Sequence, residues 1–522
     1  MRNKEWEQSK EAKREEPGLE DNRVGSGKTI SRRALLASLG TAGVVMAASA
    51  LWPDRSYAAT ITEAVSGESG ERKKDSDRDK VDMKKRLSAA SECSVEDFGA
   101  VGDGVTDDTT AIQLAIDSAA GKTVCVPGHL TCIVSTLLLP SSTHFKVDGT
   151  LFKKAGTSGA IIRNADQTQG NDHIRITVGG MIDGNKSGQT QVENKVGLLD
   201  FVKCSHISVQ AAGVIRGNYF PVALASNMTT ACVYVKNSEF VTLNISRLED
   251  YGREALWLQN CSDSNIEGLN AIGGADSWSG LQISGTRNMI CNVRVIDAGA
   301  SGISIDSTHS VVSDCIVKDN KYFNGFNFGH AGVPAHYTTV VNCISINAGH
   351  MTTSATNVAN GFNIVAGSQS VALVNCRAIG AYRHGFNVSD NAVDASLTGC
   401  VAIGCGVFGL TAWNTKLQAT SCDFRGNTHR FNQGGTTEAL LTNVRLADDP
   451  MTQTISVAGL GAGGTVTVAN LNVTAASKLT LQPVNGEGLD AGAFISQVDK
   501  GSFVITTRSN GATGAAVRAD IG

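Results

Sequence analysis

Residues 302–305 read Gly-Ile-Ser-Ile, and this Gly-apolar-x-apolar unit recurs through the middle of the chain. The same frame is found at 232–235, 255–258, 280–283, 325–328, 361–364, 385–388 and 409–412. Successive units are 22 to 25 residues apart, except for one step of 36. A constant period of this length indicates a repeat architecture in which each repeat packs only on its neighbours. The alternation of apolar and polar residues within each unit is typical of a strand.

A second register lies 13 to 18 residues after the glycines and is marked by cysteine, so each repeat contains at least two strands. These cysteines are Cys315, Cys343, Cys376, Cys400 and Cys422. Stacked repeats of this kind predict an all-β fold, a right-handed parallel β-helix built as a single-stranded solenoid. The long step places extra residues in two loops, 329–336 and 349–359. We interpret the cysteines as an interior ladder of small apolar side chains, with disulfides between adjacent rungs as the alternative. The chain has no CxxC pair, so a zinc site is not expected.

Composition excludes several protein classes. The 522 residues include 57 Gly but only 8 Pro, which excludes collagen and proline-rich linkers, and 41% are hydrophobic, enough to fill a core. The net charge of −4 offers no basic field for nucleic acid or an anionic membrane. Residues 93–522 carry 27 basic and 33 acidic groups, so this part of the chain is mildly acidic and poor in charge.

The first 92 residues have the features of an export signal and a linker. Arg32 and Arg33 precede a weakly apolar stretch, 34–51, and Ser56-Tyr57-Ala58 suits cleavage before Ala59. This pattern resembles a twin-arginine signal over residues 1–59. The alternative, a membrane anchor, would need a longer and less polar stretch. Residues 60–92 contain 16 charged positions in 33 and predict a solvated linker.

Residues 94–117, SVEDFGAVGDGVTDDTTAIQLAID, predict a short helix capped by Asp107 or Asp108, followed by a strand at 122–127. This run, with Gly-Met-Ile-Asp-Gly-Asn at 180–185, strongly resembles the opening of the pectate-lyase-like β-helix superfamily, in its rhamnogalacturonase- and epimerase-like branch. The resemblance extends over about residues 93–447 and implies a secreted glycan-processing β-helix. The superfamily also contains hydrolases, lyases, epimerases, phage tailspikes and proteins without activity.

The narrower signatures of pectin-degrading members are absent. Of the polygalacturonase motifs only His384-Gly385 is present, and the Arg-x-Pro-x-x-Arg stretch of pectate lyases is missing. A pectin substrate is therefore not supported by the motifs. Residues 451–522 change character: they are rich in Val, Thr, Gly and Ala, contain no cysteine, and predict a small β-sandwich-like module. This module could bind carbohydrate, support oligomerisation or cap the open end of the β-helix.

The interior of a β-helix is packed, so function is expected on an outer face or in loops. One candidate surface is the row of middle residues in the repeat strands, where polar side chains and a tryptophan suit sugar rings. The substrate-binding candidates are Trp257, Gln282, Asn327, His330, Asn363, Tyr382 and Asn387. The alternative is that the asparagines are a solvated ladder without a ligand.

The other candidate surface is the turn before each repeat glycine, because aligned turns bring their side chains to adjacent rungs about 5 Å apart. Glycoside hydrolysis uses two carboxylates at about 5 Å or about 6.5–9.5 Å, so a pair is expected from Asp276, Asp297, Asp306 and Asp319. This expectation requires the aspartates to share one face. A lyase would instead use cations and proton-transfer groups, and the candidates are Lys321, Tyr322, His350, Arg383 and His384.

The sequence therefore predicts a secreted enzyme that cleaves a polysaccharide, with hydrolysis favoured over β-elimination because the turns are richer in Asp than in Lys or Arg. The alternative class is a non-catalytic glycan-binding surface protein, and a phage-type depolymerase is disfavoured by the export signal. No cofactor or metal is expected, although clustered acidic side chains could hold Ca²⁺. The expected partner is the polysaccharide, with no nucleic acid and no membrane after signal cleavage, and the expected state is a monomer or a homotrimer.

Overall fold

The computed structural model describes residues 91–119, 121–221, 229–275, 277–330, 332–353, 359–434 and 436–446, and the short segments 452–456, 465–469, 479–483, 493–499, 502–506 and 516–521. The expected export signal and all but two residues of the expected linker lie outside these ranges. Among the described residues, no helix is long and apolar enough to cross a bilayer.

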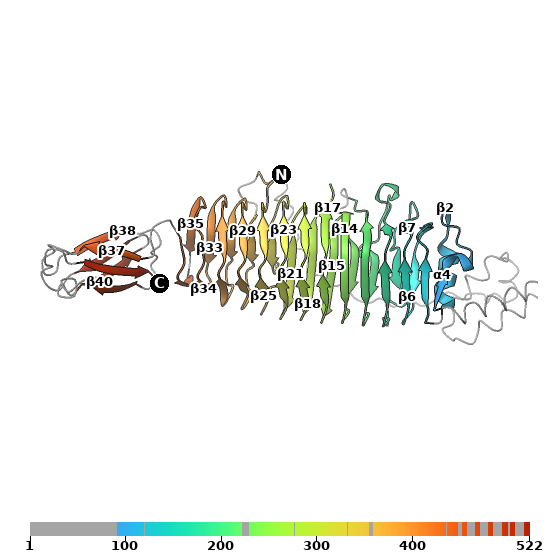
Figure 1. Cartoon of the computed structure of the whole chain (residues 1–522), viewed down its shortest axis with the longest axis horizontal. Helices are drawn as coiled ribbons and strands as arrows, with labels where there is room; N and C mark the ends of the chain where they lie inside the picture. The colour runs from blue at the N-terminus through green and yellow to red at the C-terminus, as the bar shows by residue number, and fades with distance from the viewer. Residues whose placement is uncertain are drawn as a thin grey trace, which may run out of the picture. The chain divides into compact units, whose positions relative to one another are not determined.

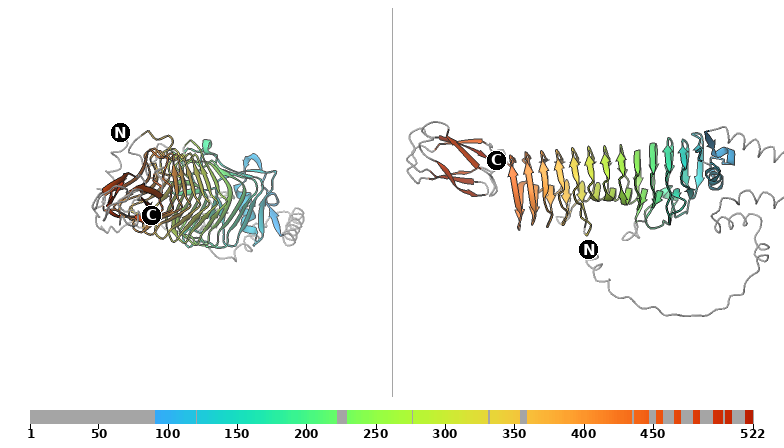
Figure 2. Two further views of the ribbon diagram at one scale, coloured as in Figure 1. Left: turned by 60° about the vertical axis from the view of Figure 1, so that its left-hand side comes forward. Right: turned by 90° about the horizontal axis from the view of Figure 1, so that it is seen from below.

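The repeats form a parallel β-helix, as the sequence predicts, in which successive coils stack on one another (Figures 1 and 2). A complete coil has three strands, for example β18, β19 and β20, which is one more than the minimum of two that the repeats indicate. Two of the three strands belong to a 24-stranded sheet, sheet A, and the third belongs to a 12-stranded sheet, sheet B. The repeat units of the sequence form the strands of sheet B.

Sheet B consists of β5 (Leu137–Leu139), β8 (Ile162–Asn164), β11 (Val196–Val202), β13 (Thr230–Lys236), β15 (Glu254–Ser262), β18 (Ser279–Thr286), β21 (Ile303–Thr308), β24 (Phe326–Phe328), β27 (Phe362–Ile364), β30 (His384–Val388), β33 (Phe408–Trp413) and β35 (His429–Gly434). Sheet A consists of β1 (Glu92–Ser94), β2 (Asp103–Asp107), β3 (Thr123–Val126), β4 (Thr131–Val134), β6 (His144–Val147), β7 (Thr150–Lys153), β9 (Arg175–Val178), β10 (Met181–Asp183), β12 (Ser208–Arg216), β14 (Thr242–Tyr251), β16 (Asn265–Glu267), β17 (Asn270–Gly273), β19 (Met289–Cys291), β20 (Arg294–Ile296), β22 (Val311–Ser313), β23 (Ile316–Lys318), β25 (Thr339–Val341), β26 (Ile344–Ile346), β28 (Ala372–Val374), β29 (Arg377–Ile379), β31 (Ala395–Thr398), β32 (Val401–Ile403), β34 (Lys416–Thr420) and β36 (Glu438–Thr442).

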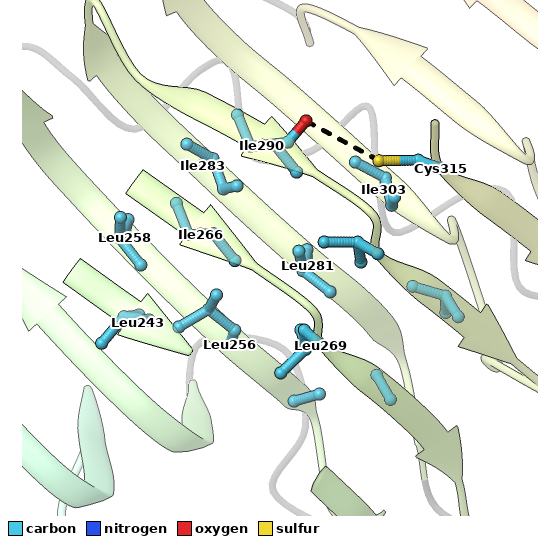
Figure 3. Close-up of a cluster of buried hydrophobic side chains, with 14 of the residues drawn as sticks. Leu243, Leu256, Leu258, Ile266, Leu269, Leu281, Ile283, Ile290, Ile303 and Cys315 are labelled. Atoms are coloured by element: carbon cyan, nitrogen blue, oxygen red, sulfur yellow. Dashed lines mark hydrogen bonds between the residues drawn. The ribbon is translucent and has the colours of Figure 1, made fainter. Parts of the chain in front are cut away.

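The core is built from like residues stacked in register. Phe326, Phe362 and Phe386 pair across β24, β27 and β30, and their rings stack with centroids 4.8 and 5.0 Å apart. Figure 3 shows the aliphatic part of the same interior, where Leu and Ile side chains of both sheets meet Cys315. Because every coil offers the same inward positions, one continuous apolar core runs through the stack.

The cysteines are part of this interior, as expected. Among the described residues all thirteen are unpaired, and every one except Cys291 is buried. Their thiols point to backbone carbonyls: Sγ of Cys315, for example, donates to the Ser313 carbonyl oxygen at 3.1 Å. The interior-ladder interpretation therefore holds, and the disulfide alternative does not.

The repeat glycines are required by close packing. A Cβ atom at Gly302 would collide with the side chain of Val317, and one at Gly325 would collide with Ser345. In both cases the neighbour belongs to the sheet A strand that ends the same coil, β23 for Val317 and β26 for Ser345. Any larger residue would push the two sheets apart, which explains why a glycine begins most of the repeat units.

A short cap closes the beginning of the stack. The predicted helix is α4 (Thr109–Ser118), preceded by the 3-10 helix η2 (Val95–Phe98). Asp107 accepts the Thr109 N–H at 3.1 Å, whereas the Asp108 carboxylate accepts the N–H groups of Val101 and Gly102 at 2.7 and 3.1 Å. Asp107 therefore caps the helix, and Asp108 fixes the preceding loop.

The C-terminal region contains two three-stranded antiparallel sheets in its described segments. One is β37 (Thr452–Ser456), β42 (Ala516–Ile521) and β39 (Leu479–Pro483), and the other is β38 (Thr465–Ala469), β41 (Ser502–Thr506) and β40 (Phe494–Asp499). Phe503 and Ile505 of β41 are fully buried. The change from parallel to antiparallel pairing agrees with the predicted small β-rich module.

Candidate functional site

The middle residues of the sheet B strands form one outward-facing row in exact register. Trp257 pairs with Gln282, Gln282 with Ser304, and Ser304 with Asn327, and the row continues through Asn363, Asn387 and Thr411. These residues are partly or wholly shielded, and Trp257 retains only 8% of its accessible surface. The surface is therefore polar and continuous, and Trp257 is not an exposed platform.

The three asparagines bond to one another. Asn387 Nδ2 donates to Asn363 Oδ1 at 2.6 Å, and Asn363 Nδ2 donates to Asn327 Oδ1 at 2.7 Å. Asn327 Nδ2 in turn donates to the Gly329 carbonyl oxygen at 2.5 Å. Because these amides satisfy each other, they first of all hold adjacent coils together and fix the loop after β24. This agrees with the alternative interpretation of the asparagines as a ladder without a ligand.

That loop carries His330 to a carboxylate of the preceding coil. His330 Nδ1 lies 2.7 Å from Oδ2 of Asp306, and the Asp306 side chain is 1% exposed while that of His330 is 50% exposed. Among the described residues Asp306 Oδ1 has no hydrogen-bond partner, and Oδ2 has only the contact with His330. The contact with Asp306 raises the pKa of His330, against the opposing effect of burial. A buried carboxylate that orients a half-exposed imidazole is an arrangement suited to proton transfer.

The turn before sheet B stacks residues with positive φ. Asp297 (φ 59°), Asp319 (φ 56°) and Asn347 (φ 54°) occupy this position on three coils, and glycine occupies it on the next three. Asp and Asn tolerate the left-handed region better than other residues with a Cβ. The backbone conformation alone therefore explains the residue types in this row, including both aspartates.

Ion pairs and hydrogen bonds also engage these two aspartates. Lys321 Nζ lies 3.4 Å from Asp297 Oδ2 and donates to the Gly274 carbonyl oxygen at 3.2 Å. Asp319 Oδ1 accepts Asn347 Nδ2 at 2.8 Å. Lys321 is mostly buried, so it ties adjacent turns together rather than standing free for a ligand.

The four candidate aspartates do not form one cluster. Asp297 and Asp319 lie on neighbouring rungs of the turn before sheet B, whereas Asp306 lies within β21, toward the other side of sheet B from that turn. Asp276 lies outside the described residues. The expectation that the aspartates share one face is therefore not met by the three that the structure describes. Several strand residues, each about 3.3 Å long, separate Asp306 from the turn that carries Asp297 and Asp319.

Exposed apolar side chains accompany the turn. Trp278, Tyr322, Met351 and Tyr382 keep between 37% and 49% of their surface accessible and lie on turns that hydrogen-bond to one another along the stack. Sequence reasoning singled out Tyr322 and Tyr382 but not Met351. Aromatic side chains at such positions offer flat apolar faces to sugar rings.

The remaining predicted turn residues differ in accessibility. His350 is exposed, with Nδ1 3.2 Å from the Asn320 carbonyl oxygen, and Arg383 is half-buried. His384 is buried and stacks on Phe408 with ring centroids 5.5 Å apart. Burial, helped by Arg383, lowers the pKa of His384 to about 4. A buried neutral imidazole in an aromatic stack is poorly placed to meet a polysaccharide.

Sequence reasoning missed a charged group on the early strands of sheet B. Arg163 Nε donates to Asp200 Oδ2 at 3.1 Å, and its Nη2 donates to Glu193 at 2.7 Å. Burial raises the pKa of Asp200 to about 6, and burial also raises the pKa of Glu254 to about 7. The sequence signal for this group is Asp200, a single aspartate inside the apolar run at 196–202. A buried carboxylate needs a charged or hydrogen-bonding partner, so its presence there predicts one.

Residues 93–327 match a protein-family model described as Rhamnogalacturonase A/epimerase, pectate lyase-like. This segment is therefore similar to that family, in agreement with the resemblance of its opening motif. Among described residues, no cluster of three or more His, Cys, Asp or Glu side chains could hold a metal ion.

Two curated relatives are glycan-degrading proteins. The chain is 24% identical over 249 residues to an exo-poly-alpha-D-galacturonosidase of Dickeya chrysanthemi, covering 40% of this chain and 41% of the relative. It is 34% identical over 120 residues to depolymerase 1 of Klebsiella phage K5-2, which is capsule K30/K69-specific, covering 20% of this chain and 15% of the relative. The chain thus spans less than half the length of either relative.

Among solved structures, the pre-mature gene product 12 of bacteriophage phi29 superposes with a TM-score of 0.50 at 18% identity. The match covers 67% of this chain and 52% of that one. At this identity the likeness concerns the fold alone.

Proposed function

We propose that this chain binds a polysaccharide on the outer face of sheet B and cleaves its glycosidic bonds, with hydrolysis as the reaction. The observation that carries the proposal is the contact between the buried Asp306 carboxylate and the half-exposed His330 imidazole. The match of residues 93–327 and the galacturonosidase relative support a glycan-directed activity. The twin-arginine pattern supports a site of action outside the cell.

In this proposal His330 is the proton donor and Asp306 is its positioning residue. The imidazolium gives its proton to the departing glycosidic oxygen as the carbon–oxygen bond breaks, and a water molecule adds to the anomeric carbon. The proton that this water loses returns to the neutral imidazole, so one water is consumed per bond. Asp306 favours the protonated ring and fixes its orientation. Gln282 and Ser304, which pair across neighbouring strands of the outward row, offer polar groups to the sugar hydroxyls.

A second reaction, β-elimination, is favoured by one specific observation. At this site a histidine meets one carboxylate, that of Asp306, rather than two carboxylates meeting each other. A neutral His330 could instead take the proton next to a uronate carboxyl group, and elimination would leave an unsaturated product with no added water.

The test uses the full chain and a panel of uronic-acid and neutral polysaccharides, with the products weighed by mass spectrometry. Products heavier by one water per cleaved bond indicate hydrolysis, and unsaturated products with ultraviolet absorbance indicate elimination. His330→Gln should reduce cleavage by about 10²–10⁴-fold, the usual contribution of a general acid or base. Asp306→Asn should move the activity optimum to lower pH.

Asp314→Asn is the matched control, because Asp314 lies on the turn between β22 and β23 with positive φ, which Asn tolerates equally. Full activity in His330→Gln would refute the assigned proton donor. A wild-type chain that binds glycans from the panel but cleaves none would instead favour the non-catalytic glycan-binding alternative.

A further inference from the structure

A pocket of about 410 Å³ lies on the edge of sheet A where the chain turns toward sheet B, on early coils of the stack. Phe152, Asp183 and Arg216 line it from β7, β10 and β12, and they pair in register on three successive rungs. Glu249 of β14 continues the row. The motif at 180–185, which no step of the proposed cleavage uses, supplies two of the lining residues, Asp183 and Asn185.

The rung of Arg216 has no side chain at the turn, which leaves room for the pocket. Gly217 has φ 71°, and a Cβ built there would lie 3.1 Å from Asp183 Oδ1. Above it, Lys186 reaches across from one coil to Asp250 two coils further on, with Nζ 3.0 Å from Oδ1. The glycine leaves the space open, and the Lys186–Asp250 pair covers it.

The charged groups around the pocket are balanced and loosely paired. Arg216 Nε lies 3.4 Å from Asp183 Oδ2, and Arg216 Nη1 lies 3.7 Å from Glu249 Oε1. Nε is buried and has no hydrogen-bond partner among the described residues. A buried guanidinium N–H without an acceptor is costly, so a ligand oxygen at this place would be favoured.

This combination fits a neutral sugar. Paired cations and carboxylates leave no excess charge to attract an ionic ligand, yet they offer donors and acceptors to neighbouring hydroxyl groups. Phe152 adds an apolar wall for the C–H face of a ring. The volume is within the range of small-molecule sites, about 300–1,000 Å³.

We infer that this pocket binds a neutral pyranose unit of the glycan, at a subsite separate from Asp306 and His330. The inference takes from the proposed function only the expectation that the ligand is a sugar. Binding at this pocket does not require that the chain cleaves the glycan. Arg216 donates to the sugar hydroxyls, Asp183 and Asp250 accept from them, and Phe152 contacts the ring face.

Binding is tested by calorimetry and saturation-transfer NMR on the full chain, with glucose, galactose, mannose and rhamnose as neutral probes and galacturonate and glucosamine as charged ones. At least one neutral sugar should bind, and more tightly than the charged sugars. Arg216→Met should weaken this binding by about tenfold or more, since it removes charge-assisted hydrogen bonds. Gly217→Asn should abolish it by filling the pocket, because Asn tolerates positive φ.

The controls are Arg175→Met, an exposed arginine of β9, and Gly268→Asn, a glycine with φ 69° whose Cβ would meet Asn244 Oδ1 at an ordinary contact distance of 3.7 Å. Both should bind as the wild type does. Equal binding by Gly217→Asn and wild type, or binding of the charged probes alone, would overturn the inference. Neutral-sugar binding that persists in His330→Gln while cleavage is lost separates this subsite from the reaction. A wild-type chain that cleaves a polysaccharide but binds none of the neutral probes would overturn the inference alone.

Discussion

His330 Nδ1 lies 2.7 Å from Oδ2 of Asp306, although the two residues come from different coils. The register between β21 and β24 puts the end of one strand beside the start of the loop that follows the next. The hydrogen bond from Asn327 to the Gly329 carbonyl oxygen then fixes the loop backbone next to His330. The position of the imidazole is therefore set by the stacking of coils.

The first prediction concerns the titration of His330. Asp306 raises its pKa above 6.5, so the contact stabilises the folded chain fully below pH 6.5 and this contribution is lost as pH rises through the higher folded value. In Asp306→Asn, NMR titration should give a lower pKa for His330 than in the wild type. An unchanged pKa would mean that the carboxylate does not act on the ring.

The second prediction concerns His384, whose pKa falls from 6.5 to about 4 on folding. Below pH 6.5 His384 becomes protonated in the unfolded chain, whereas in the folded chain it stays neutral until about pH 4. The free energy of unfolding therefore decreases as pH falls through this window. The expected loss is about 3 kcal/mol. His384→Phe should remove it in urea unfolding curves at pH 7 and pH 4, whereas the exposed His350→Gln should not.

The third prediction concerns the amide ladder. Asn363 accepts hydrogen bonds from Asn360 and Asn387 and donates one to Asn327, while it is 6% exposed. Asn363→Ala leaves buried polar groups unpaired and should lower the free energy of unfolding by about 2–4 kcal/mol. Gln282→Ala, on the same row but outside the ladder, should cost less. Equal losses in chemical denaturation would argue against a cooperative ladder.

The fourth prediction concerns thiol reactivity. Every cysteine except Cys291 is buried, and burial raises the pKa of thiols such as Cys125 and Cys204 to about 11. The native chain should therefore label quickly at one cysteine, and Cys291→Ala should remove that fast phase. Full labelling of all thirteen should follow only after unfolding. Rapid labelling at several positions in native conditions would contradict the interior ladder.

Much of the fold could be read from the sequence because a solenoid repeats one local rule. The glycine-led units, the inward cysteines and the cap at 94–117 each fix a local feature that the structure reproduces. The third strand of each coil was not resolved by the repeats, since its segments are only three to five residues long, from β22 to β34, and lack a marker residue.

The site was less predictable, because it depends on which side chains of different coils meet. Asp297 and Asp319 were expected as catalytic candidates, yet their positive φ values explain them as turn residues. Asp306 and His330 were each singled out, but in separate roles. The pocket at Gly217 left no sequence signal beyond the 180–185 motif.

The sequence by itself determined the β-helix and the inward ladder, because these follow from a repeated alternation of apolar and polar residues within each coil. Only the tertiary structure decided that Asp306 meets His330, that the asparagines bond to each other and that Arg216 faces a pocket. The physical reason is that these contacts run between coils: they depend on register and on loop conformation, which the spacing of residues along one coil does not specify.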